Sequence, residues 1–229
     1  MSIGDAETKT QERVIRFFKD PEILGYQYIG NLSDYQNKNI KEDRLRQYLR
    51  LKGYADKLID AAIMQLQQEA GNLSRGVYDA NKTVYSRLKY GIPVSESPEK
   101  PPVTVQLVDE EKPLNNDFAI AEEVTVVEQS EKRPDLVVYL NGIAVAVIEL
   151  KRSSISVSEG IRQNLTNQKN SFIQSFFTTM QFCMAGNESE GLRYGTLLTG
   201  EKFYMEWKDD GFKEHEEERD PVDVRISKT

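Results

Sequence analysis

The sequence predicts an α/β fold in which a mixed sheet is flanked by helices, with an added helical subregion near the N terminus. Three observations lead to this prediction. Helical patterns dominate up to about residue 90, and short apolar runs of strand length dominate from residue 103 onward. The segment SESPEKPP, at residues 95–102, contains three prolines and separates the two halves. One run, IAVAVIELK, is apolar on both faces, as expected of a strand in the middle of a covered sheet.

The N-terminal half is predicted to be mainly helical. Apolar residues recur at helical spacing in four segments, and each of the last three stops at a glycine. The predicted helices cover residues 6–18, 39–54, 55–72 and 76–90, and a strand is expected at residues 24–30. Because such apolar stripes usually form core, residues 38–92 are expected to be a helical insertion and not a cofactor site.

The C-terminal half is predicted to be rich in strands. Strands are expected in the segments VTVQLVD, FAIAEEVTVV, LVVYL and IAVAVIELK. A helix should follow, with an apolar face formed by Ile161, Leu165, Phe172, Ile173, Phe176 and Phe177. GLRYGTLLTGEKFYMEWK then predicts a strand pair that turns at Gly200. The residues after Trp207 are acidic and poor in apolar side chains, so a solvated linker is expected there.

The composition excludes several kinds of catalytic site. The chain has 229 residues, with one cysteine and one histidine. Cys183 lies in an apolar stretch, where an inert buried thiol is expected, and His215 lies in an acidic one. A zinc site of the Cys/His type cannot be built, and Ser-His-Asp or Cys-His catalysis is improbable. Any metal would therefore have oxygen ligands and be a hard cation such as magnesium.

Features of the whole chain indicate where the protein works. The N terminus is polar, no window reaches transmembrane length, and no intrachain disulfide can form, so a cytoplasmic protein is expected. The net charge of −7 argues against a general nucleic-acid clamp. However, residues 132–171 have six basic and three acidic side chains, whereas residues 206–220 have three basic and eight acidic ones. The basic surplus coincides with a predicted β-hairpin.

This hairpin, RPDLVVYLNGIAVAVIELKRS at residues 133–153, gathers three charges at one end. Asn141-Gly142 between two apolar runs is a strong signal for a hairpin turn. Folding there brings Asp135 close to Glu149 and Lys151, and strand alternation places Glu149 and Lys151 on one face. Two converging carboxylates repel each other unless a lysine or a divalent metal lies between them. Ordinary solvated strand ends are the alternative explanation for the three residues.

The register of the hairpin tests the predicted site. If Leu140 pairs with Ile143 and the ladder is regular, Asp135 falls opposite Ile148 and on the other face from Glu149. Convergence of the two acids requires a three-residue loop, a bulge, or a local bend at Asp135. We expect such an irregularity, because an Asn-Gly turn tolerates a bulge-type loop. A regular hairpin would exclude the site.

The charged hairpin resembles a known nuclease signature. Pro134-Asp135, thirteen intervening residues and the run 149–151, ELK, resemble the PD-(D/E)xK motif. More narrowly, RPDLVVYLNGIAVAVIELK, NNDFAIAEEVTV, GIRQN, AGN and LRYGT resemble the N-terminal nuclease domain of the restriction (motor, R) subunit of type I restriction-modification enzymes. The resemblance implies a PD-(D/E)xK restriction-endonuclease-like fold. It also implies one nuclease domain over residues 1–210, with its strand-rich catalytic core at 103–207 and an acidic linker at 211–229.

The resemblance also implies roles for individual residues. Asp135 and Glu149 would be the metal-binding carboxylates, and the backbone carbonyl of Leu150 would add a ligand. Lys151 would orient the attacking water or stabilise the pentacovalent phosphate. An ordinary lysine is a poor base near neutral pH, which favours the electrostatic role. Gln163 corresponds to the glutamine of the family's Q-x-x-x-Y element.

Several further residues have less specific support. Asn167 occupies the tyrosine position of that element, and its amide can bind DNA or a phosphate but cannot stack as a ring does. Glu12 is a candidate for the metal-side acid that many such nucleases place on their first helix, with an ordinary first-turn glutamate as the alternative. Arg152, Arg162 and Lys169 are candidate phosphate contacts, with solvated helix charges as the alternative.

The function implied by the resemblance is that of a Mg²⁺-dependent DNA endonuclease domain, which cuts nonspecifically after ATP-driven translocation. No G-x-x-x-x-G-K-[ST] motif occurs, so the ATP-binding motor would lie outside this chain. The expected partners are double-stranded DNA and the methylation and specificity subunits of a restriction complex, with no membrane. Two alternatives remain open: a recombination or repair nuclease of the same superfold, and a catalytically silent docking module.

Overall fold

The computed structural model describes residues 3–97 and 99–208 of the chain. The predicted linker at 211–229, with His215, lies outside the described residues. The helices are α1 (Ile3–Lys19), α2 (Glu42–Leu51), α3 (Asp56–Gly71), α4 (Val77–Tyr90) and α5 (Val157–Asn167), with short 3₁₀ helices η1 (Pro113–Asn115), η2 (Gln174–Thr179) and η3 (Glu201–Phe203). The predicted helices of the N-terminal half are therefore confirmed to within a few residues at each end.

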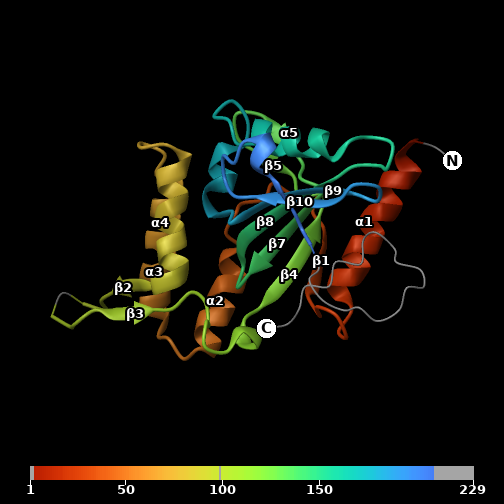
Figure 1. Cartoon of the computed structure of the whole chain (residues 1–229). Helices are drawn as coiled ribbons and strands as arrows, with labels where there is room; N and C mark the ends of the chain where they lie inside the picture. Colours follow the sequence, from red (N-terminus) through yellow and green to blue (C-terminus); the bar gives the residue numbers. More distant parts are fainter. Residues whose placement is uncertain (1–2, 98, 209–229) are drawn as a thin grey trace.

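A seven-stranded mixed sheet forms the centre of the molecule, in the order β1-β4-β7-β8-β9-β10-β11 (Figure 1). Its strands are β1 (Gln27–Asn31), β4 (Phe118–Glu122), β7 (Leu136–Leu140), β8 (Ile143–Leu150), β9 (Phe182–Asn187), β10 (Gly191–Gly195) and β11 (Met205–Glu206). β1 is parallel to β4 and β8 is parallel to β9, whereas the other neighbours are antiparallel. The predicted central strand is confirmed, since β8 lies between β7 and β9 and is buried along nearly its whole length.

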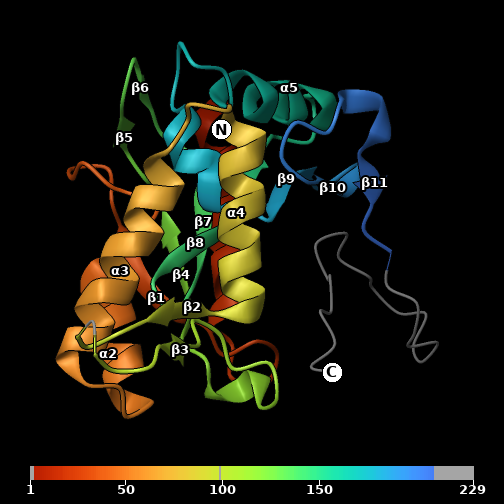
Figure 2. The same ribbon diagram turned by 90° about the vertical axis from the view of Figure 1, so that its left-hand side faces the viewer.

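Helices cover both faces of this sheet, because the side chains of β7 alternate between two apolar clusters. Leu136 and Val138 pack with the buried face of α1, while Val137 and Tyr139 pack with η2 and the start of α4. Figures 1 and 2 show α1 on one side of the sheet and α3 and α4 on the other. Full burial of a side chain such as Phe177 contributes about 1.5–3 kcal/mol, so these two clusters supply much of the stability of the fold.

The helical subregion has its own apolar cluster and extends further along the chain than predicted. A separate two-stranded sheet, β2 (Ile92–Val94) with β3 (Val103–Val105), packs with α3. Val105 and Leu107 are fully buried in the cluster formed by α2, α3 and α4. The segment VTVQLVD, predicted as a strand of the C-terminal half, is therefore a short strand that pairs with the helical subregion.

One further prediction about the elements was wrong, and one strand was not predicted. The helix predicted through residues 172–177 ends at Asn167, and turns followed by η2 replace its second half. Polar turn-forming residues at 168–171 and a bond from the N–H of Ile173 to the carbonyl of Asn167 break the helix there. Strand β9 was not predicted, because its sequence FCMAGN is poor in β-branched residues. The strand is defined by pairing with both β8 and β10.

Two other predicted strand segments, FAIAEEVTVV and the pair after residue 190, differ in detail from the observed strands. The segment FAIAEEVTVV divides at Glu123, where φ is 50°, into β4 and the short strand β5 (Val126–Val127), which pairs with β6 (Glu131–Lys132). The predicted pair after residue 190 is confirmed, since β10 pairs with β11. Its connection is η3 and not a tight turn at Gly200.

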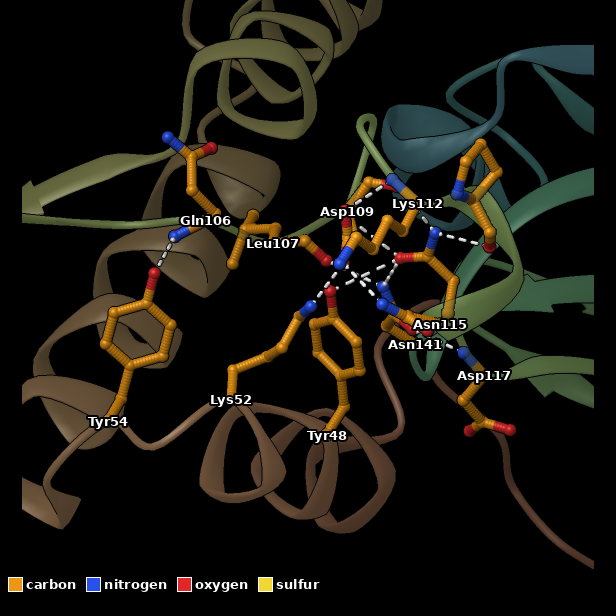
Figure 3. Close-up of polar contacts among 12 residues, drawn as sticks. Tyr48, Lys52, Tyr54, Gln106, Leu107, Asp109, Lys112, Asn115, Asp117 and Asn141 are labelled. Carbon is orange, nitrogen blue, oxygen red and sulfur yellow. Dashed lines mark hydrogen bonds and ion pairs between the residues drawn. The ribbon is translucent and has the colours of Figure 1, made fainter.

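Asn141 anchors the turn of the β7–β8 hairpin to the helical subregion. Its buried side-chain amide donates to the Leu107 carbonyl and to Oδ1 of Asn116, both at 2.8 Å, and its Oδ1 accepts from the Asp117 N–H at 2.7 Å (Figure 3). Asn116 in turn contacts Asp109, which forms an ion pair with Lys52, the residue directly after α2. The network fixes the turn end of the hairpin. The charged end lies at the other end of the same two strands.

Candidate active site

A β-bulge sets the register of the hairpin. Leu140 pairs with Ile143 across a two-residue turn, and both turn residues have a positive φ, as a type I′ turn requires. The ladder then shifts between Val138 and Tyr139, so that one residue of β8, Val145, has no partner in β7. The predicted irregularity is confirmed, and of the three forms considered it is a bulge, inside β8.

This extra residue brings the two acids to the same position in the ladder. After the bulge, Leu136 pairs with Ile148, so Asp135 and Glu149 are the next residues opposite each other. Side chains directly opposite in an antiparallel pair share one face, with Cβ atoms about 5 Å apart. Without the bulge, Asp135 would face away from Glu149, and no site could form.

The Glu149 carboxyl is fully buried and only partly satisfied. Its Oε2 accepts a hydrogen bond from Nε2 of Gln163 at 2.6 Å. Its Oε1 is buried without a hydrogen-bond partner among the described residues. Asp135 is half-buried, and its Oδ2 accepts the backbone N–H of Leu150 at 2.6 Å. This bond fastens the Asp135 carboxylate to the end of β8, beside Glu149.

The positive charge of Lys151 does not compensate for the burial of Glu149 and its repulsion by Asp135. Burial raises the pKa of Glu149 well above its usual range, and the neighbouring charge of Asp135 raises it further. Lys151 acts in the opposite direction, and its ammonium lowers the pKa of Glu149 without offsetting the two other effects. A cation placed between the two carboxylates would relieve both their repulsion and the cost of burying Glu149.

Lys151 lies on the same side of the hairpin end as the two acids. Its backbone N–H donates to the Gly186 carbonyl at 2.9 Å, which continues the pairing of β8 with β9. Its half-buried side chain donates from Nζ to the Leu150 carbonyl at 3.0 Å. The carbonyl expected to bind a metal thus holds the lysine ammonium in this structure.

Helix α5 positions Gln163 over Glu149. The helix can approach the sheet closely because it carries Gly160, where a Cβ would lie 2.9 Å from the Cβ of Ala185 and 3.4 Å from the Glu149 carbonyl. Asn164, the next residue after Gln163, donates from Nδ2 to the Met184 carbonyl at 2.8 Å. Together these contacts hold the helix at the distance at which the Gln163 amide reaches Glu149.

The donor set at the hairpin end fits a hard, well-hydrated cation. Asp135 and Glu149 offer carboxylate oxygens, and the buried Oε1 of Glu149 has no hydrogen-bond partner in the described part of the chain. Within residues 3–97 and 99–208, no three His, Cys, Asp or Glu side chains are grouped so that they could hold an ion directly. Mg²⁺ often binds through one or two carboxylates and keeps several waters, which matches a site with two acids.

The other predicted site residues lie in different surroundings. Glu12 is exposed on α1, whereas its buried neighbour Gln11 contacts two glutamates at the end of β4. Asn167 is 2% exposed at the end of α5, so its side chain is not presented to a DNA surface.

The candidate phosphate contacts also differ in exposure. Arg152 is half-buried and Lys169 is exposed. Arg162 is exposed but forms ion pairs with Glu159 and Glu201. Arg162 would have to leave these partners to contact a phosphate, whereas Lys169 lies at the surface.

Sequence reasoning missed one acidic residue next to the site. The backbone N–H of Glu123, directly after β4, donates to the Asp135 carbonyl at 2.8 Å. Its side chain pairs with Arg133 and accepts a hydrogen bond from Gln11. The signal was the EE pair in FAIAEEVTV, but only the register of β4 against β7 shows which of the two glutamates lies beside Asp135.

The sheet, its flanking helices and the acids at adjacent strand ends define a PD-(D/E)xK-like nuclease fold. A family model described as the type I restriction enzyme R protein N terminus matches residues 6–203, and the chain belongs to this family. A search of curated proteins returned no match.

In the part of the chain that the structure describes, no helix is both long and apolar enough to cross a membrane.

Proposed function

We propose that this domain is a Mg²⁺-dependent DNA endonuclease, which hydrolyses phosphodiester bonds nonspecifically within a type I restriction complex. The observation that carries the proposal is the bulge in β8, which places Asp135 opposite the buried Glu149. A bulge that aligns two acids next to a lysine is difficult to explain by stability alone, because buried acids in contact destabilise a fold. Membership of the R protein family supports the same function.

The residues of the site would have two roles: the acids would bind the metal ion, and Lys151 would stabilise negative charge on the phosphate. Asp135 and Glu149 would hold the metal ion, which when bound supplies a positive charge at the scissile phosphate and acidifies a coordinated water. The ammonium of Lys151 would move from the Leu150 carbonyl to the phosphate and stabilise its developing negative charge. Gln163 would act as a positioning residue, because its amide fixes one oxygen of Glu149 and leaves the other available.

The partners of the domain follow from the same proposal. Double-stranded DNA would reach the site by ATP-driven translocation through motor regions outside this chain, and the methylation and specificity subunits would select the target. Delivery by a motor explains how a chain with a net charge of −7 can act on DNA with few basic contacts of its own. Arg152 and Lys169 are the proposed phosphate contacts, and Arg162 would join them after release from Glu201.

The proposal is tested by substitutions in the R protein that contains this domain. Lys151→Ala and Asp135→Asn should each reduce DNA cleavage about 100-fold or more, because they remove charge stabilisation or a metal ligand. Translocation and ATP hydrolysis should stay within twofold, roughly, since neither residue belongs to a motor. Lys57→Ala, at an exposed position of α3, is the matched control. Cleavage retained in both site variants would instead favour the silent docking module.

A further inference from the structure

We infer that Glu123 is a third acidic residue of this site, and that it contacts the bound divalent cation through a coordinated water. The inference rests on the proposed function, because it assigns a further residue to the same cation. It replaces the expectation that the additional acid would come from the first helix, where Glu12 is exposed.

The strand register places three acids in one row. Glu122 pairs with Leu136 in the β4–β7 ladder, and Leu136 pairs with Ile148 in the β7–β8 ladder. One position further along, the row continues with Glu123, Asp135 and Glu149. The bond from the Glu123 N–H to the Asp135 carbonyl, at 2.8 Å, confirms that the first two are adjacent beyond the end of β4.

The side chain of Glu123 is held in place by contacts from two other segments. Its Oε2 lies 2.7 Å from Nε of Arg133, and its Oε1 accepts from Nε2 of Gln11 at 3.3 Å. The Glu123 side chain is 25% exposed, so water can reach its carboxylate.

A second observation points from this acidic row to a ligand. Oε1 of Glu149 is buried, no described residue donates a hydrogen bond to it, and the strand register puts Asp135 opposite this residue. A buried oxygen in this state is costly unless something positive or protic reaches it. The row thus has an open coordination position at its most buried member.

The contact from Glu123 would run through water and not directly to the ion. In the described residues, no three acidic side chains are close enough to bind one ion together. Mg²⁺ keeps several of its waters, and carboxylates that hydrogen-bond these waters orient them and strengthen binding. The ion pair with Arg133 fixes the position of the Glu123 carboxylate.

Neighbouring Glu122 provides a matched control. It carries the same charge, is adjacent in sequence and shares the Gln11 donor with Glu123, but its Oε1 accepts from the Tyr28 hydroxyl at 2.6 Å, on the α1 side of the sheet. Substitution of either glutamate by glutamine changes the net charge equally. A difference between them therefore reports on position and not on the overall charge of the domain.

The experiment is calorimetric titration of Mn²⁺ into the 229-residue chain and its variants. Glu123→Gln should weaken Mn²⁺ binding about 10-fold or more, whereas Glu122→Gln should change it by less than about twofold. Glu123→Asp keeps the charge and should retain most of the affinity, because a water-mediated contact tolerates a shorter side chain. Circular dichroism without metal checks that each variant is folded, and Glu123→Ala serves as the test if the glutamine variant is not.

Asp135→Asn separates failure of this inference from failure of the proposed function. Loss of Mn²⁺ binding in Asp135→Asn, with wild-type affinity in Glu123→Gln, overturns the role of Glu123 and leaves the proposed site intact. Equal weakening in Glu123→Gln and Glu122→Gln also overturns it, since charge alone would then explain both. Wild-type affinity in Asp135→Asn, or no binding by the unsubstituted chain, contradicts the proposed function itself.

Discussion

Glu149 is a carboxyl group that the fold buries completely, next to a second acid, and its Oε2 accepts a hydrogen bond from Gln163. Its pKa is raised by burial first and by Asp135 second, so the cation-free protein favours the protonated acid. Such a group weakens the fold at neutral pH, because it must either keep a proton or ionise without water. The burial of Glu149 thus lowers the stability of the cation-free fold. A cation bound at the proposed site would offset this cost.

Glu149→Gln should therefore stabilise the cation-free domain. A neutral amide removes the buried charge and can donate to Asp135, so we expect the free energy of unfolding at pH 8 to rise by roughly 1–3 kcal/mol. Urea denaturation measures the change, with Glu159→Gln on the exposed side of α5 as the control. A less stable Glu149→Gln variant would show that the carboxyl is a structural group and not a metal ligand.

At this scale the sequence predicted which charged residues converge at the hairpin end, but not which residues surround them. Asp135, Glu149 and Lys151 follow from the apolar runs, the turn signal and strand alternation. The approach of Gln163 was implied only by the family resemblance, since it depends on how α5 packs. Glu123 could not be distinguished from Glu122, because the register of β4 against β7 depends on long-range pairing and not on a local turn.

At the scale of elements, the site depends on the close approach of α5 to β8 and β9. The approach is possible because Gly160 leaves no side chain between the helix and the sheet. The bulge in β8 and the type I′ turn then set which residues of the hairpin face this helix. Helix, bulge and turn must all be in place for the Gln163 amide to reach Glu149.

Gly160→Ala should displace α5 from the sheet. The added Cβ would lie 2.9 Å from the Cβ of Ala185, so the helix must shift, and overpacking of this kind costs about 1–3 kcal/mol. Thermal unfolding measures the loss of stability. Gly71→Ala at the end of α3 is the control, because its Cβ would meet nothing within 4 Å. Equal effects of the two substitutions would contradict the packing argument.

The network at the turn should contribute to stability in a pH-dependent manner. The hydrogen bond from Lys52, followed by those from the Lys112 N–H and Asn115, lowers the pKa of Asp109 from 3.8 to about 2. Because the folded pKa is depressed, the stabilisation is complete above pH 3.8 and is lost as the pH falls towards about 2. Asp109→Asn should lower stability at pH 7 and flatten its pH dependence between these values. An unchanged acid unfolding curve would contradict this role.

Elements with local signals were predicted well, and elements defined by distant partners were not. The amphipathic helices and the β7–β8 hairpin are encoded by spacing and turn residues. Strand β9 contains alanine, glycine and asparagine, and becomes a strand because β8 and β10 pair with its two edges. Strand β3 is too short for its sequence to indicate which sheet it joins, and its partner β2 lies across the proline-rich loop.

At the scale of the whole molecule, the hairpin connects the helical subregion to the proposed site. Its turn is fixed to the helical subregion through Asn141 (Figure 3), and its other end carries the proposed site. β8 has eight residues, so the two regions are separated by roughly 25 Å at about 3.3 Å per residue. The helical subregion and the acids therefore lie at opposite ends of the hairpin.

The central claim is that Asp135 and Glu149 together bind a divalent cation. Anomalous diffraction from crystals grown with Mn²⁺ tests it most directly, because it locates the ion itself. We predict one main anomalous peak at the hairpin end, in direct contact with carboxylate oxygens of Asp135 and Glu149. Manganese bound elsewhere, with these two carboxylates hydrogen-bonded only to protein groups, would contradict the account.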